Sequence, residues 1–179
     1  AMLGCSGEAD ELAALRSKDA RQVLEAFEKS STGLMGRASI APVVDGYALP
    51  KAPHEVFAEG RQHRVPLLIG NNADEGMLFL GNRDLTLQQY RTVLSLLYGR
   101  MAPEVEAMFP ATSDRDVKEA YNNLFTSLGF GGPSRHAAVC TARVGAPVYV
   151  YLFTMKSTEA SSRHMGAYHG YELPFVFGT

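Results

Sequence analysis

A histidine and two upstream carboxylates are the residues of this chain whose types and setting suit proton-transfer chemistry. His169 lies between two glycines in the segment Gly166-Ala-Tyr-His-Gly-Tyr-Glu172, and Asp74 and Glu75 follow a short apolar run. A neutral imidazole can take a proton from a hydroxyl group, and an ionised carboxylate can fix its tautomer and stabilise the imidazolium that forms. The pattern predicts a histidine base with a carboxylate partner.

The residues alone leave other interpretations open. His169 could instead be a loop histidine bonded to a backbone group, and spacing does not decide between Asp74 and Glu75 as its partner. His164, His169 and Glu172 form a loose set of metal-ligand types, but no helical His-x-x-x-His occurs, so we expect no zinc site. We expect Glu172 to be a structural carboxylate bonded under the histidine segment.

Two apolar runs predict the strands that would carry these groups. Val65–Gly70 is typical of a buried parallel strand and ends before the carboxylates. Val148–Phe153 is a β-branched and aromatic run, followed by a polar linker that leads to His169. No G-x-S-x-G motif, a usual setting for a nucleophilic serine, occurs in the 179 residues. The sequence therefore offers an acid and a base without that serine motif.

The remaining segments predict helices and loops. Residues 8–29 read as two short helices, and residues 31–64 as loop with a few short strands, because glycine and proline recur there. Further helices are predicted after Thr86, at Pro103, after Ser113 and after a break at Gly131-Gly-Pro133, the last running to Val144. Two strands do not complete a parallel sheet, so we expect short strands in residues 31–50 or additional chain to complete it.

Size and composition indicate one soluble domain. The chain has 179 residues, 46% of them hydrophobic, and a net charge of −2, which gives no electrostatic reason to expect a nucleic-acid or membrane partner. No apolar run reaches the roughly 20 residues that a membrane-spanning helix needs. Cys5 and Cys140 lack metal-site or redox spacing, and we expect them to be buried thiols.

Three separated motifs together resemble the type-B carboxylesterase and cholinesterase family. They are Leu3-Gly-Cys5 with Glu11-Leu-Ala-Ala-Leu15-Arg16; Pro42-Val-Val-Asp45-Gly46 with Leu49-Pro50 and Val65-Pro-Leu-Leu-Ile-Gly70-Asn-Asn-Ala-Asp74-Glu75-Gly76 and Phe79; and Val148-Tyr-Val-Tyr-Leu-Phe153 with Gly166-Ala-Tyr-His169-Gly-Tyr-Glu172-Leu-Pro-Phe175-Val-Phe177-Gly178. They occur in the order expected for that family and cover nearly the whole chain.

The resemblance implies an α/β fold, namely the C-terminal portion of an α/β-hydrolase, with residues 1–179 forming a single partial domain. It assigns Glu75 as the triad acid and His169 as the triad base, and leaves Asp74 as a turn-forming residue. The implied activity is hydrolysis of small carboxylic esters through an acyl-enzyme, without cofactor or metal. The aromatic residues Phe79, Phe130, Tyr171 and Phe175 are candidates to line an acyl pocket.

The chain departs from the family pattern in two ways. Many members pair a cysteine that matches Cys5 with another at the position of Ala14, so Cys5 is expected to be a free thiol here. Unpaired cysteines favour a bacterial or otherwise reducing, cytoplasmic setting. The second departure is the missing serine motif, which in the family precedes the acid and the base. We therefore expect the isolated chain to be inactive.

Two rival hypotheses remain at this point. The family also includes members that lost the nucleophile and bind partners as adhesion or scaffold proteins. Retention of Glu75 and His169 argues against that role, because binding alone does not need them. The second is that the chain associates with itself, or with a missing N-terminal half, through an exposed edge of the sheet.

Overall fold

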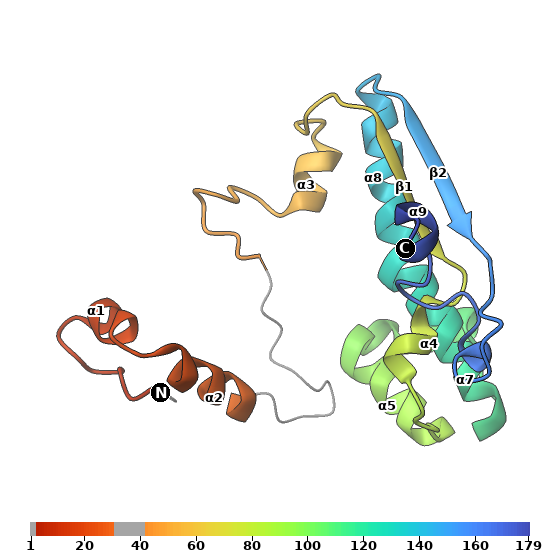
Figure 1. Ribbon diagram of the computed structural model, residues 1–179, viewed down its shortest axis with the longest axis horizontal. Coiled ribbons are helices and arrows are strands. Elements are labelled where there is room, and N and C mark those ends of the chain that lie inside the picture. Colours follow the sequence, from red (N-terminus) through yellow and green to blue (C-terminus); the bar gives the residue numbers. More distant parts are fainter. Residues whose placement is uncertain (1–2, 31–41) are drawn as a thin grey trace. The chain divides into compact units, whose positions relative to one another are not determined.

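The computed structural model describes residues 3–30 and 42–179 of the chain. These residues form two compact units, Ala1–Pro50 and Lys51–Thr179. The first unit contains α1 (Glu11–Arg16) and α2 (Ala20–Ser30), the two helices expected there (Figure 1). Asp10 begins α1 by accepting a hydrogen bond from the Ala13 backbone N–H at 2.9 Å.

The sheet lies in the second unit and consists of two parallel strands. β1 (Leu67–Asn72) pairs with β2 (Val148–Phe153), with Leu67 opposite Val148 and Asn72 opposite Phe153. The second strand has the predicted bounds. The first begins and ends two residues later than predicted, beyond Pro66, which has no backbone N–H to donate. The polar residues Asn71 and Asn72 are thereby part of the strand.

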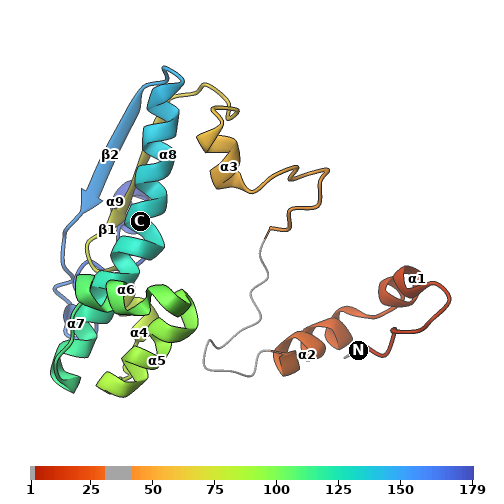
Figure 2. The same ribbon diagram turned by 180° about the vertical axis from the view of Figure 1, so that it is seen from behind.

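The helices of the second unit have these bounds: α3 (Pro53–Ala58), α4 (Glu75–Leu80), α5 (Leu87–Tyr98), α6 (Ala102–Met108), α7 (Asp114–Leu124), α8 (Gly132–Arg143) and α9 (Leu173–Phe177). Short 3-10 turns occupy Gly99–Met101 and Arg163–Met165. The long helix α8 packs along both strands, as Figures 1 and 2 show from opposite sides. α3 packs in turn against α8.

Most predicted helix starts are confirmed. Thr86 and Gln89 form a reciprocal cap at the start of α5, the Thr86 hydroxyl accepting from the Gln89 backbone N–H at 3.2 Å. α6 begins beside Pro103. At α7 the capping group is Asp116, whose carboxylate accepts hydrogen bonds from the backbone N–H and hydroxyl of Ser113, so Ser113 is the N-cap residue but does not cap with its own side chain.

Two predictions about the connecting segments were wrong. Gly131-Gly-Pro133 does not break the chain, because a π-helical segment, Phe125–Gly131, joins α7 directly to α8. Pro133 is tolerated in the first turn of α8, where its missing N–H leaves no helical bond unmade. The predicted loop of residues 31–64 contains α3. No strand forms in residues 42–50, and residues 31–41 lie outside the described part of the chain.

The apolar core of the second unit lies among α5, α6 and α7. Its buried members are Tyr90, Leu94, Ala102, Val105, Ala111, Val117, Ala120 and Leu124. The hydroxyl of Tyr90 donates to the Phe109 carbonyl oxygen at 2.8 Å, and burial raises the pKa of Tyr90 to about 12. This core fixes α7, which carries residues that contact the candidate site.

Candidate active site at the carboxyl ends of the strands

The candidate site lies where β1 and β2 end. Because the strands are parallel, their carboxyl ends share one edge of the sheet, which is where ligands bind in open α/β sheets. Asp74 and Glu75 follow β1 at the start of α4, and the segment after β2 returns to the same edge. The backbone N–H of Asp74 donates to the Ala167 carbonyl oxygen at 3.0 Å, which brings His169, two residues later, to the end of β1.

His169 and Glu75 are in direct contact. The Nδ1 atom of His169 lies 2.7 Å from Oε2 of Glu75. The Glu75 side chain is only 4% exposed, whereas that of His169 is 43% exposed. Because a carboxylate only accepts hydrogen bonds, this contact favours the tautomer with hydrogen on Nδ1 and leaves Nε2 able to accept a proton.

The other oxygen of Glu75 is also bonded. Oε1 accepts a hydrogen bond from the backbone N–H of Asn72 at 2.7 Å. Charge-assisted bonds of this kind hold a carboxylate in one orientation. Glu75 is therefore fixed from the strand on one side while its second oxygen faces the imidazole.

Asp74 has a different set of contacts from its neighbour. Its Oδ2 accepts from the Ala167 backbone N–H at 2.9 Å, and its Oδ1 accepts from the Asn122 side-chain amide at 3.1 Å. Asn122 is buried on α7. The sequence favours a turn in which Asp74 bonds nearby backbone groups, but its backbone partner is 93 positions away. It ties the histidine segment to β1 and to α7.

Aromatic rings lie against His169. The ring centroids of Phe79 and Phe130 lie 5.2 Å and 5.0 Å from that of the imidazole. The other two aromatic candidates, Tyr171 and Phe175, contact each other at a centroid distance of 5.5 Å. Phe79 and Phe130 therefore give the imidazole an apolar setting.

Within the described part of the chain, the side chains of Glu172 and His164 have no hydrogen-bond partner in common. The Glu172 carboxylate accepts a hydrogen bond from the Asn72 side chain. His164 is exposed in the 3-10 turn Arg163–Met165. Among the residues that the structure describes, no group of three or more His, Cys, Asp or Glu side chains is arranged to hold a metal ion.

The structure adds two residues that the sequence did not single out. Asn72 and Asn122 are both buried, and both bond to the carboxylates or to the histidine segment. A signal for Asn72 was present in the sequence, because a polar residue directly extends the apolar run of β1. Asn122 offered no comparable signal, since asparagine at a single helix position is common on solvated faces.

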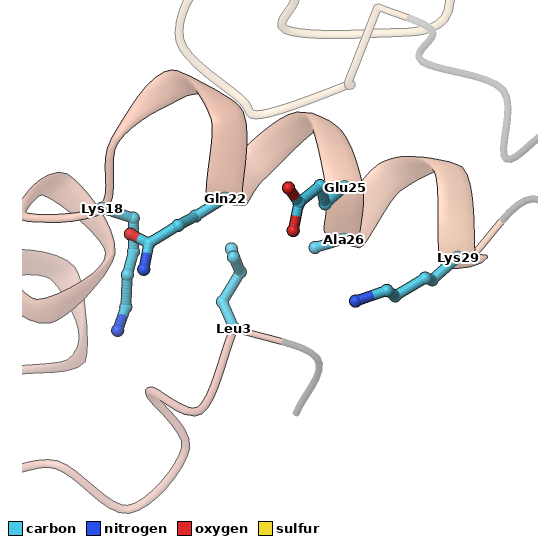
Figure 3. Close-up of a pocket in the computed structure, with 6 residues that line it drawn as sticks. All are labelled: Leu3, Lys18, Gln22, Glu25, Ala26 and Lys29. Atoms are coloured by element: carbon cyan, nitrogen blue, oxygen red, sulfur yellow. The ribbon is translucent and has the colours of Figure 1, made fainter.

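A small hollow of about 170 Å³ occurs in the first unit (Figure 3). It is lined by Leu3, Lys18, Gln22, Glu25, Ala26 and Lys29. Its charged lining residues are two lysines and one glutamate, and it contains none of the candidate catalytic residues.

Both cysteines are free and buried, as expected from the lack of pairing. In residues 3–30 and 42–179, no helix has both the length and the apolar character that crossing a membrane would require.

The chain is similar in sequence to known esterases. The sequence profile of the Carboxylesterase family matches residues 1–179. Fumonisin B1 esterase of Sphingopyxis macrogoltabida is 31% identical over 94% of this chain and 32% of its own length. Para-nitrobenzyl esterase of Bacillus subtilis (strain 168) is 28% identical over 97% of this chain and 34% of its own length.

The fold has a solved counterpart. The crystal structure of Aspergillus niger EstA superposes with a TM-score of 0.79 and 23% identity, covering 99% of this chain and 37% of that chain. This chain therefore spans about a third of the length of the proteins it matches. The α/β fold that the resemblance implies is confirmed, and the chain belongs to the carboxylesterase family of α/β-hydrolases.

Proposed function

We propose that this chain supplies the acid and the base of a carboxylic ester hydrolase that works through an acyl-enzyme. The observation that carries the proposal is the 2.7 Å contact between His169 Nδ1 and the buried carboxylate of Glu75. That contact holds one ring nitrogen and leaves Nε2 available for proton transfer. Membership of the carboxylesterase family supports an ester as the substrate class.

The proposed reaction has two steps, acylation and deacylation, and in each step His169 takes up a proton and gives it away. Nε2 of His169 takes the proton of a serine hydroxyl as its oxygen attacks the ester carbonyl, and then gives that proton to the leaving alcohol. Nε2 next takes a proton from the water molecule that attacks the acyl-enzyme, and gives it to the serine oxygen as the acyl–serine bond breaks and the carboxylic acid leaves. Glu75 stabilises the imidazolium in both steps without itself taking the proton. No metal or cofactor enters this scheme.

In this proposal the serine comes from outside these 179 residues, which contain no G-x-S-x-G motif. We propose that residues 1–179 are the C-terminal portion of an α/β-hydrolase domain. A further part would then supply the serine and the oxyanion-binding backbone groups. Exposed apolar side chains on the strands, Leu68 at 70% and Val150 at 65%, suit a surface that such a part would cover.

The test is hydrolysis of a p-nitrophenyl ester by this chain alone and by this chain together with the serine-bearing part. We expect no turnover above background alone, and titratable turnover in the complete enzyme. His169→Ala should lower kcat by roughly four orders of magnitude or more. The matched control is His164→Ala, which replaces an exposed histidine in the 3-10 turn just before that segment and should leave kcat unchanged. Full activity of the complete enzyme with His169→Ala would overturn the proposal.

A non-catalytic binding protein is the alternative from another class. It would use the fold without transferring protons, so that replacing His169 would leave its binding intact. The buried pairing of Glu75 with His169 favours the enzyme, because a binding surface has no need of a carboxylate held behind an exposed imidazole. If the complete protein bound a partner and hydrolysed no ester, the alternative would be favoured.

A further inference from the structure

One buried residue bonds both to the acid and to the segment that carries the base. Asn72 ends β1 and is 0% exposed. Its backbone N–H donates to Glu75 Oε1 at 2.7 Å, and its side-chain amide donates to the Tyr168 carbonyl oxygen at 2.8 Å. Tyr168 directly precedes His169. Asn72 therefore holds the acid through its backbone and the segment of the base through its side chain.

The side-chain amide of Asn72 also reaches the residues after the histidine. Its Nδ2 donates to Oε2 of Glu172, three positions beyond His169. A carbonyl and a carboxylate both accept only, so they fix the orientation of the amide: rotated by half a turn, it would turn Oδ1 toward both acceptors. The two bonds bracket His169, because one lies before it and the other after it.

We propose that Asn72 is a positioning residue for His169, an inference that rests on the proposed function. Its side-chain bonds go neither to the imidazole nor to the reacting atoms. It acts by holding the Tyr168 backbone before His169 and the Glu172 side chain after it, which keeps His169 at the distance that Glu75 requires. Losing this hold lets the imidazole move away from Oε2. A displacement of about 1 Å at a catalytic group can lower the rate roughly 100-fold.

The first test is NMR of the 179-residue chain, observing the proton on Nδ1 of His169. We expect its hydrogen bond to Glu75 to slow its exchange with water. Asn72→Asp keeps the size of the side chain and removes both donors, whereas Asn72→Ala also leaves a cavity. We expect both variants to speed exchange of this proton by about 10-fold or more.

Tyr90→Phe is the control for a general loss of stability. It removes a buried hydrogen bond to Phe109 within the α5–α7 core and leaves the contacts of Asn72 in place. We expect it to lower the free energy of unfolding without changing exchange of the His169 proton. Wild-type exchange in Asn72→Asp, or equal acceleration in Tyr90→Phe, would overturn the positioning role and leave Asn72 a structural residue.

A charge exchange tests the same contact by rescue. Asn72→Asp combined with Glu172→Gln reverses donor and acceptor, so the bond between strand and segment forms again. We expect the double variant to regain part of the exchange protection that Asn72→Asp loses, and no recovery would contradict the proposal. If Asn72→Asp alone does not fold, the double variant compared with Glu172→Gln decides the matter.

The complete enzyme gives a second readout. There Asn72→Asp should lower kcat by roughly 10- to 100-fold with little change in KM, because orientation of the base and not substrate binding is lost. An unchanged kcat would overturn the proposal. The NMR measurement needs no turnover. A protein that hydrolyses no ester would thus refute the proposed function while the contact of Asn72 with the histidine segment could still be confirmed.

Discussion

Gly166 lies so close to Asp74 that a Cβ atom at position 166 would stand 2.2 Å from Asp74 Oδ2. The glycine also has φ +66°, a conformation that other residues avoid. Asp74 cannot easily move away, because the backbone of Ala167 and the side chain of Asn122 hold its two oxygens. The histidine segment is thus laid directly against the end of β1.

Gly166→Ala should therefore destabilise the chain more than backbone strain alone explains. Gly99→Ala is the matched control: Gly99 has nearly the same backbone angles, with ψ −120° against −136° at Gly166, and nothing lies within 4 Å of its Cβ position. We expect about 1–3 kcal/mol of strain at both positions and a further loss at 166 from the clash. Urea unfolding measures both, and equal losses would contradict this packing.

Asn122→Ala should destabilise the chain by about 1–3 kcal/mol, because it leaves Oδ1 of Asp74 without its buried donor. Asn123→Ala is the control, since Asn123 is the next residue on α7 and is exposed. Its cost should stay within about 0.5 kcal/mol. Urea unfolding of the two variants compares them directly. Equal costs would mean that the bond between Asn122 and Asp74 contributes nothing measurable.

Asp116 makes the stability of α7 depend on pH in the acid range. Hydrogen bonds from Thr112 and then from Ser113 lower the pKa of Asp116 from 3.8 to about 2. Since the folded state holds the proton less tightly than the unfolded state, this stabilisation is present above about pH 4 and is lost as the pH falls to about 2. Asp116→Asn should flatten that part of the stability profile. If the free energy of unfolding fell by the same amount between about pH 4 and about pH 2 in the wild type and in Asp116→Asn, the assignment would be contradicted.

The sequence was sufficient for the parts of the fold that depend on local chemistry. The apolar run Val148–Phe153 and the capping pair of Thr86 and Gln89 specify their elements with few neighbours. The break predicted at Gly131-Gly-Pro133 was wrong. The local preference of glycine and proline favours a break there, but packing keeps the chain helical through a π-helical segment. The helix Pro53–Ala58 lay hidden in a region rich in proline, although proline readily begins a helix.

The candidate site was predictable only in the part that depends on residue type and order along the chain. His169 and Glu75 are chemically distinctive, so their types and their order along the chain indicate a base and a candidate acid. The roles of Asp74, Asn72 and Asn122 depend on contacts between residues 48 to 100 positions apart. Such contacts arise only when the fold brings the end of β1 beside the histidine segment and α7, and no local sequence pattern indicates them.

The measurement that tests the central claim most directly is ester hydrolysis by the complete enzyme carrying Glu75→Gln, beside the same enzyme carrying Asp74→Asn. The two substitutions neutralise adjacent carboxylates, and of the two only Glu75 contacts His169. We predict that Glu75→Gln lowers kcat by roughly 10³- to 10⁴-fold, because the imidazole loses its orienting acceptor. Asp74→Asn should mainly lower stability. Equal activity of the two variants, or a larger loss with Asp74→Asn, would contradict the account.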